Sequence, residues 1–363
     1  MISLANSNIT DEVRKNVNAC LDENRIGQGR FNKQFEEDTA KYLGVKHAIV
    51  VNNGTMADMV ALGALKAKYP EKTEVIVPAY TFIAQTNAIF MNGLTPVFVD
   101  VGEDYQMDVS QVEAKITDKT LCIFVVHLFG RTSDILILKD IAQKHNIGLA
   151  EDCCEAFGGK YGIKGVDGDG RVPKFGTMGD FGTFSFFPSH TITTGEGGMV
   201  ITNNDELADL ARQVSNHGRR SDNILEKFTF DVFGYNGKMS NVLAAIGCAI
   251  LPTADDVIAK RRINVKTYNN LLGKDWYASS PHCYPVRYES EEERDNTLKR
   301  LWENGVEARK AFSSLPTQEK VYAHLGYKLG DFPKAEYFGK HVLFLPVHQG
   351  LTETEIQFIC TLL

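Results

Sequence analysis

The sequence lacks the features that mark several common classes of protein. Its seven cysteines form no CxxC pair, and their spacing fits neither a zinc site nor a disulfide framework. No apolar run approaches the roughly 20 residues that a membrane-spanning helix needs. No basic block is interleaved with aromatic residues and the net charge is −7, so we expect neither nucleic acid nor a membrane as a partner.

The opening segment, MISLANSNITDEVRKN, has neither a basic start nor an apolar core, so we expect no secretory signal and a cytoplasmic protein. The composition, 43% hydrophobic and 23% charged, is that of a globular chain. A length of 363 residues exceeds what one core usually serves. We therefore predict a large domain over residues 1–250 and a smaller C-terminal α+β domain over 251–363, which includes a long linking helix near 252–272.

Apolar, strand-like runs alternate with helix-length segments early in the chain. HAIVV (47–51) precedes a helical pattern over 54–68, and LCIFVVHLFG (121–130) precedes another over 133–146. Further strands are expected over 75–78, 96–101, 147–152, 182–187 and 198–202. This alternation predicts an α/β fold, in which right-handed crossovers build a mainly parallel sheet sandwiched by helices.

Two strand-to-helix turns carry candidate binding residues. In NNGTMAD (52–58), Gly54 and Thr55 open a helix, whose free amides and dipole can hold a phosphate group. The same residues could simply cap the helix. In EDCCEAFGG (151–159), Asp152 could face a protonated ring nitrogen or cap the following helix, and the sequence supports both interpretations equally.

A third turn, FFPSHTITTGEGG, joins two expected strands. Ser189 could add a hydroxyl to the phosphate site, and His190 could act as a general base near neutral pH or lie solvated in the loop. Phe82, which follows a strand in VPAYTF, could stack on a flat ring or belong to the core. A phosphate site, a stacking aromatic, an acid for a ring nitrogen and a base are what a pyridoxal-type cofactor needs, together with a lysine.

The sequence resembles the DegT/DnrJ/EryC1/StrS family of sugar aminotransferases over nearly its whole length. The similar segments include RIGQGRFNKQFEEDTAKYLGVKHAIVVNNGT, VPAYTFIAQTNAI, AEDCCEAFG, FSFFPSHTITTGEGGMV and LFLPVHQGLT. The resemblance implies the aspartate-aminotransferase-like fold, PLP fold type I. It also implies a homodimer with shared active sites and pyridoxal 5'-phosphate (PLP) or pyridoxamine 5'-phosphate (PMP) as the cofactor.

The resemblance assigns a role to each cofactor-binding candidate. The cofactor phosphate would be held by Gly54, Thr55 and Ser189. Phe82 would stack on the ring, and Asp152 would pair with the ring nitrogen.

Other residues are implied in contacts farther from the ring. Asn236, in GYNGKMSN, would reach the phosphate of the neighbouring subunit's cofactor. His217 and Arg219 lie in a segment that resembles the family's substrate-facing loop. His348, in LPVHQG, resembles a site contact. For His217 and Arg219, a solvated position on the surface is an equally good interpretation.

The sequence departs from the family at the residue that links the cofactor. Ordinary members have a lysine where this chain has His190, and an imidazole has no primary amine with which to form that link. A histidine-containing branch of the family, the deoxysugar 3-dehydratases, acts on nucleotide-linked 4-keto-6-deoxy sugars. The Cys154-Glu155 pair also matches this branch, which includes the GDP-4-keto-6-deoxy-D-mannose 3-dehydratase of colitose synthesis, whereas Cys153 and Thr191 do not.

The resemblance to this branch predicts a dehydratase of deoxysugar and lipopolysaccharide biosynthesis, in which L-glutamate restores PMP. His190, Asp152 and Glu155 are the expected catalytic residues, and Glu155 would help to place His190. The sequence contains no C-x-C pair, so we expect no iron–sulfur cluster, and we expect no metal. Two alternatives remain: a nucleotide-sugar aminotransferase whose lysine has been replaced, and an inactive paralogue that still binds cofactor.

Overall fold

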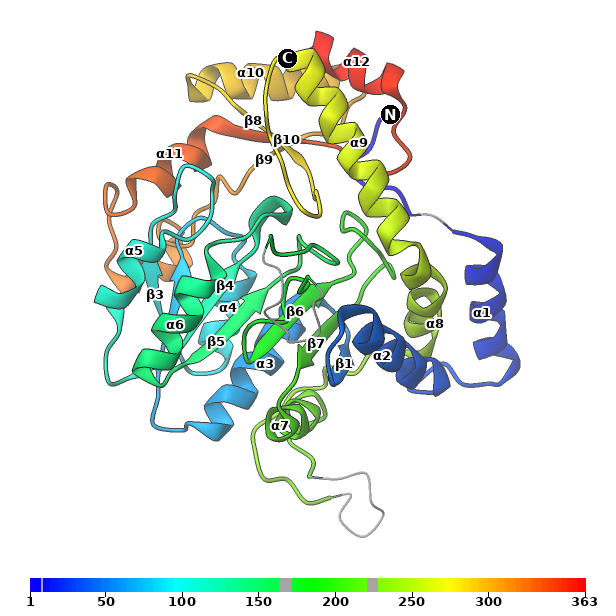
Figure 1. Cartoon of the computed structure of the whole chain (residues 1–363), viewed down its shortest axis with the longest axis vertical. Coiled ribbons are helices and arrows are strands. Elements are labelled where there is room, and N and C mark those ends of the chain that lie inside the picture. The colour runs from blue at the N-terminus through cyan, green and yellow to red at the C-terminus, as the bar shows by residue number, and fades with distance from the viewer. Residues whose placement is uncertain (8, 163–171, 221–227) are drawn as a thin grey trace.

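A seven-stranded sheet forms the centre of the protein (Figure 1). The computed structural model describes residues 1–7, 9–162, 172–220 and 228–363. The strand order is β1-β7-β6-β5-β4-β2-β3; β7 is antiparallel to both neighbours and the other neighbouring pairs are parallel. The strands are β1 (His47–Val51), β2 (Glu74–Pro78), β3 (Thr95–Val99), β4 (Thr120–Val126), β5 (Gly148–Asp152), β6 (Phe181–Ser185) and β7 (Gly198–Thr202). The predicted α/β fold with a mainly parallel sheet is confirmed.

The direction of β7 follows from the short loop that precedes it. Phe186 donates its backbone N–H to the Gly197 carbonyl (2.8 Å) and accepts from the Thr194 N–H (2.9 Å), so the loop is closed on itself. A parallel return would need a crossover, usually through a helix, and no helix separates β6 from β7. The closed loop holds His190 next to the carboxyl end of β6.

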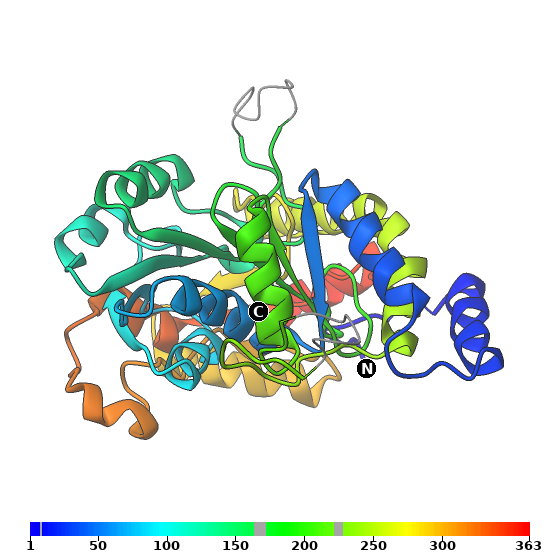
Figure 2. The ribbon, with the colours of Figure 1, turned by 90° about the horizontal axis from the view of Figure 1, so that it is seen from below.

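Helices cover both faces of this sheet (Figure 2). Ile49 and Val51 of β1 share an apolar core with α3, α4 and α7, and Ala48 and Val50 share another with α2, α6 and α8. These pairs point to opposite faces because side chains alternate along a strand. The helices are α1 (Asp11–Asp22), α2 (Arg30–Leu43), α3 (Gly54–Lys68), α4 (Ala84–Met91), α5 (Val109–Val112), α6 (Ile135–His145), α7 (Asp205–Ser215), α8 (Asn241–Ile250), α9 (Ala254–Leu272), α10 (Glu291–Glu303), α11 (Pro333–His341) and α12 (Glu353–Thr361).

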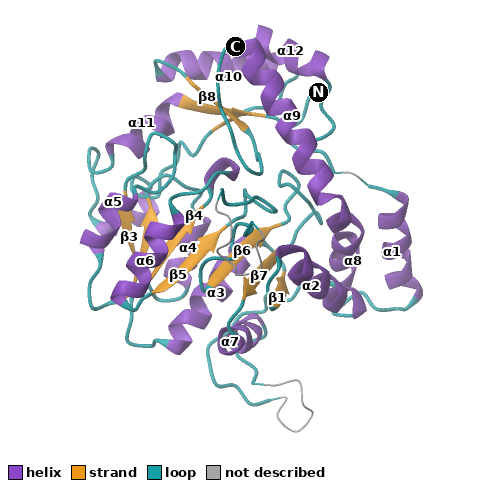
Figure 3. Ribbon diagram, viewed as in Figure 1, coloured by secondary structure: helices purple, strands orange, loops and turns teal. Residues whose placement is uncertain are grey.

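A smaller α+β unit lies beyond the carboxyl ends of the parallel strands (Figure 3). Its sheet has the order β8-β10-β9 and is antiparallel, with β8 (Tyr284–Arg287), β9 (Arg309–Lys310) and β10 (Val342–Leu345). The N-terminal end of the chain also contacts this unit, since Ile2 pairs with Val306 and the Leu4 N–H donates to the Glu307 carboxylate (3.0 Å). The predicted boundary between the two domains, at residues 250 and 251, stays a prediction.

The linking helix predicted near 252–272 is α9, which follows a short 3-10 turn, Leu251–Thr253. By length and composition alone, the stretch Asn241–Leu272 could cross a membrane, but half of its most apolar window is buried inside the protein. Arg261 of α9 is also buried, and its guanidinium donates to the backbone carbonyls of Pro281 and His190. The stretch is therefore a core helix of the fold.

Candidate active site

A cavity of about 620 Å³ lies between the carboxyl ends of the central strands and the C-terminal unit. Turns after β1, β2, β4, β5 and β6 line one side, and residues around β9 line the other. The cavity brings together most of the residues that the sequence singles out, which are Gly54, Thr55, Phe82, Asp152, Glu155, Ser189 and His190. Segments far apart in the sequence therefore meet at one site.

The N-terminus of α3 opens into this cavity. The Asn53 side chain caps the helix by accepting from the Met56 N–H (2.8 Å), and Gly54 and Thr55, whose amides lie in the unpaired first turn, line the cavity. A Cβ atom on Gly54 would lie 2.6 Å from the Ser185 Cβ, so only glycine fits this close packing. The helix dipole and the first-turn amides can hold an anion, and the half-buried Ser189 lines the same cavity.

Asp152 ends β5 and is buried. Its Oδ1 accepts from the Cys154 N–H (2.9 Å), while Oδ2 has no hydrogen-bond partner among the described residues. The two interpretations of Asp152 are thus compatible, since one oxygen caps the turn and the other is free. Asp58, from α3, lies close by and accepts from the Thr183 hydroxyl (2.7 Å).

Burial raises the pKa of both the Asp58 and the Asp152 carboxyl groups, and the charge of Asp152 raises the pKa of Asp58 further. Two buried carboxylates without a cation are unfavourable. A protonated ring nitrogen at Asp152 Oδ2 would satisfy both the charge and the missing hydrogen bond. With the α3 anion site on the same cavity, the residues fit a PLP-type cofactor.

Phe82 lines the cavity and its residue is 59% exposed. It therefore does not belong to the core, and its ring is available to stack on a bound ring. The core interpretation of Phe82 is therefore excluded, and the stacking role stays a prediction.

His190 lines the cavity from the loop after β6 and is half-buried. Its carbonyl accepts from Arg261 Nη2 (2.7 Å), which fixes the backbone, while Nδ1 of the ring lacks a partner in the described chain. Burial and the Arg261 charge lower the pKa of His190 to about 3, so the imidazole is neutral at pH 7. Lys310 carries the one primary amine among the described cavity residues, and its Nζ is paired with Asp295 Oδ2 (2.9 Å).

Glu155 follows β5 on the same side of the cavity. Its Oε2 accepts from the Phe129 N–H (2.8 Å), and its Oε1 lies 3.6 Å from His282 Nε2. Burial raises the pKa of Glu155 to about 8, with a further contribution from the charge of Asp152. His282 was not among the residues predicted from the sequence, because the segment around it, SSPHCYPV, carries no motif.

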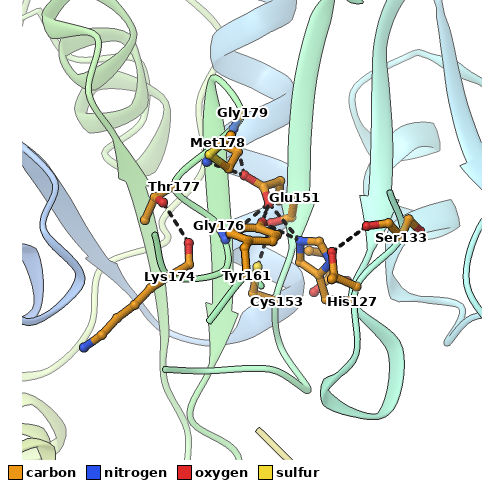
Figure 4. A network of polar contacts seen from close by, with 12 residues as sticks. His127, Ser133, Glu151, Cys153, Tyr161, Lys174, Gly176, Thr177, Met178 and Gly179 are labelled. Atoms are coloured by element: carbon orange, nitrogen blue, oxygen red, sulfur yellow. Dashed lines mark hydrogen bonds and ion pairs between the residues drawn. The ribbon is translucent and has the colours of Figure 1, made fainter. Parts of the chain in front are cut away.

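Behind Asp152, a buried network fixes the end of β5 (Figure 4). The Glu151 carboxylate accepts from His127 Nε2 (2.8 Å), from the Tyr161 hydroxyl, and from the backbone N–H groups of Met178 (2.8 Å) and Gly179 (2.7 Å). These hydrogen bonds outweigh burial and hold the pKa of Glu151 below its ordinary value. The two neighbouring acids therefore have different roles: Glu151 stabilises the fold, and Asp152 lines the cavity.

Replacing Glu151 with alanine is expected to lower the free energy of unfolding by about 3–5 kcal/mol, because its buried donors lose their acceptor. Urea unfolding measures the change. Glu292→Ala, at an exposed position of α10, is the matched control and should shift stability by no more than about 0.5 kcal/mol. Equal losses in the two variants would contradict this role.

The raised pKa values predict a pH dependence of stability. Between about pH 7 and about pH 8, unfolded carboxyl groups are ionised, whereas Glu155, whose pKa is raised to about 8, still binds a proton in the folded chain. The unfolding free energy of the cofactor-free protein should therefore fall as the pH rises, by up to about 1.4 kcal/mol per pH unit for each extra proton. Urea unfolding of wild type and Glu155→Gln tests this, because the variant should show a smaller slope. A stability that rises across the window would refute it.

Four sequence candidates lie outside this cavity. Three of them, His217, Arg219 and Asn236, lie after α7. Asn236 forms an isolated antiparallel β-bridge with Asn216, and the His217 side chain is exposed. His348 is buried elsewhere, and its Nδ1 accepts from the Gly350 N–H (3.2 Å). Within a single chain, none of the four candidates joins the cofactor-binding candidates.

This fold and this site define an α/β protein of the PLP-dependent aminotransferase type. The particular family follows from the sequence. A model of the DegT/DnrJ/EryC1/StrS aminotransferase family matches residues 7–363, and the chain belongs to that family.

Several relatives resemble the chain over almost its full length. GDP-perosamine synthase of Escherichia coli O157:H7 is 38% identical over 97% of this chain and 94% of its own. The structure of E. coli GDP-4-keto-6-deoxy-D-mannose-3-dehydratase with bound hydrated PLP has a TM-score of 0.89 at 26% identity and covers 100% of this chain and 99% of that chain. A GDP-4-keto-6-deoxymannose-3-dehydratase with a trapped PLP-glutamate geminal diamine has a TM-score of 0.87 at 25% identity, with complete coverage of both chains.

These comparisons support the predicted fold and a PLP-type cofactor, since solved relatives carry PLP. They favour the aminotransferase alternative over the dehydratase prediction, because the perosamine synthase has the higher sequence identity. The local residue at position 190 and the overall similarity thus point to different reactions within one family.

Proposed function

We propose that the protein uses PMP to remove the 3-hydroxyl group of a nucleotide-linked 4-keto-6-deoxy sugar, as a cytoplasmic step in deoxysugar and lipopolysaccharide biosynthesis. The products would be the 3,6-dideoxy-4-keto sugar and ammonia, and L-glutamate would restore the amine and leave as 2-oxoglutarate. The observation that carries this proposal is His190, which lies in the cavity where ordinary family members have a lysine. An imidazole cannot tether the cofactor, but a neutral one can move protons.

In this proposal the chain positions the cofactor through its phosphate and its ring. The amides at Gly54 and Thr55 and the Ser189 hydroxyl hold the phosphate at the α3 N-terminus. Asp152 Oδ2 holds the proton on the ring nitrogen, and Phe82 covers a ring face. The bound cofactor supplies an amine that condenses with the sugar ketone and a ring that accepts electrons.

His190 then performs the proton transfers. The neutral imidazole of His190 takes a proton from the carbon that bears the cofactor amine. The same imidazole can deliver a proton to the departing 3-hydroxyl group. A lysine at this position would offer a competing route, in which its amine reprotonates the keto carbon and leaves an amino sugar. Replacing that amine with an imidazole favours elimination.

A second candidate is a nucleotide-sugar aminotransferase. It is favoured by the 38% identity to a synthase of perosamine, which is an amino sugar. The same cofactor site would serve this reaction, and His190 would then carry both proton transfers. The two candidates differ in whether the product loses its 3-hydroxyl group or gains an amine.

The partners of the proposed enzyme are the nucleotide sugar, glutamate and a second copy of the chain. His217, Arg219 and Asn236, which lie outside the cavity of their own chain, would face the active site of the neighbouring subunit. Asn236 would contact the phosphate of the cofactor bound there. Phe230 and Phe233 in the same region are exposed, and a dimer contact would cover them. Sedimentation of the purified protein would test this assembly.

Mass analysis of the product decides between the candidates. Wild-type protein is incubated with PMP, glutamate and GDP-4-keto-6-deoxymannose, and the nucleotide sugar, ammonia and 2-oxoglutarate are measured. The proposal predicts loss of the 3-hydroxyl oxygen together with ammonia release. A retained amine would establish the aminotransferase, and cofactor binding without any product or 2-oxoglutarate would indicate an inactive paralogue; either result contradicts the proposal.

A further inference from the structure

A second imidazole, that of His282, reaches the cavity from the C-terminal unit. Its side chain is 7% exposed, and its ring centroid lies 5.1 Å from that of His190, with the ring planes inclined by 40°. Nδ1 of each ring is buried without a hydrogen-bond partner in the described parts of the chain. Two adjacent imidazoles thus each have a free nitrogen, although most buried polar atoms are paired.

The other nitrogen of His282 faces a carboxyl group. His282 Nε2 lies 3.6 Å from Glu155 Oε1, and the Phe129 N–H occupies the second oxygen, Oε2. A proton transfer between these two atoms requires the 3.6 Å separation to shorten to a hydrogen bond of about 2.8–3.0 Å. Glu155, His282 and His190 therefore form a row of three proton-binding groups that is largely shielded from solvent.

Charged groups from other elements surround this row. Arg261 of α9 and Arg309 of β9 face the rings, and Asp152 of β5 faces Glu155. Burial, the neighbouring imidazole and the two arginines hold the pKa of His282 well below its ordinary value, whereas burial raises that of Glu155 to about 8. At neutral pH the proton of this row therefore rests on the carboxyl group, and both rings are neutral.

We propose that Glu155 and His282 act through His190 as a proton store, which lets His190 gain and lose protons without exchanging them with solvent. This inference rests on the proposed function of His190. His190 gives its own ring proton to the departing 3-hydroxyl group, while a proton leaves Glu155 Oε1 for His282 Nε2 and the proton on His282 Nδ1 passes to His190. In the same elimination the His190 ring takes a proton from the reacting carbon, and the reverse transfers return one to Glu155. The row therefore holds the same number of protons before and after turnover. Glu155 and His282 are positioning residues here.

Histidine imidazole ¹⁵N spectra of the full chain, recorded against pH with and without PMP, test this arrangement. Wild-type protein should show an inflection near pH 8 at both His282 and His190, where Glu155 loses its proton. The inflection should disappear at both rings in Glu155→Gln. In His282→Asn it should disappear at His190, because the coupling passes through the missing ring.

His145→Asn, at a surface imidazole paired with Glu113, is the matched control and should keep both inflections. Wild-type spectra without an inflection near pH 8 would overturn the proposal, as would a full inflection at His190 in His282→Asn or in Glu155→Gln. These spectra need no turnover, so a failure of the dehydratase assignment is separately visible in the product analysis.

Turnover supplies a second readout. His282→Asn should lower kcat by about 10²-fold with KM within about twofold, and His282→Gln should show the same split. A rise in KM with kcat unchanged would indicate that His282 only shapes the cavity, which would also contradict the proposal.

Discussion

Replacing His190 with asparagine is expected to lower kcat by about 10³-fold while the cofactor remains bound. Asparagine keeps a polar group of similar size in the loop after β6 but cannot carry a proton at neutral pH. The backbone of the loop is held by Arg261 and by its own hydrogen bonds, so the phosphate site should persist. Product formation measured by mass spectrometry gives kcat, and PMP fluorescence gives the affinity.

Two controls frame this result. His145→Asn should keep kcat within about twofold of wild type, since an exposed substitution away from the site has little effect. His190→Lys restores a primary amine at this position and should bind PLP covalently. If His190→Asn retained wild-type turnover, another group would have to be the base, and the role of His190 would be wrong.

Asp152→Asn is expected to weaken PMP binding by roughly 10- to 100-fold and to lower kcat by about 10²-fold. The amide removes the negative charge that Asp152 Oδ2 offers to a protonated ring nitrogen, while it leaves the cap on the Cys154 N–H available. Fluorescence titration with PMP measures the affinity, and single-turnover product formation measures the chemical step.

Asp58→Asn provides a close comparison, because Asp58 is equally buried and lies beside Asp152 but is engaged with Thr183. Its effect on PMP affinity should be several-fold smaller. The reverse order, in which Asp58→Asn weakens PMP binding more than Asp152→Asn, would assign the ring nitrogen to Asp58 instead.

The sheet could be predicted because its strands are apolar runs whose two faces are both covered. The direction of β7 could not, since its sequence resembles that of a parallel strand and only the closed loop before it shows the return. The cavity residues Gly54, Asp152 and His190 were identifiable because each lies at the end of a strand or shortly after it. Asp58 was also within reach, since position i+4 from Gly54 lies on the same face of α3.

His282 and Arg309 were beyond sequence reasoning. They reach the cavity from the C-terminal unit, far along the chain from His190, and no spacing rule links them to it. The positions of His217, Arg219 and Asn236 stay predictions for a different reason. A site shared between two subunits cannot be seen in one chain.

In the proposed function, the cofactor is held without a covalent bond because His190 occupies the position at which ordinary family members have a lysine amine. Wild-type protein and His190→Lys are each loaded with PLP, reduced with borohydride and mapped by peptide mass spectrometry. We expect a cofactor adduct at position 190 in His190→Lys, and no stoichiometric adduct anywhere in the wild-type chain. A stoichiometric adduct on a wild-type lysine such as Lys310 would contradict this expectation.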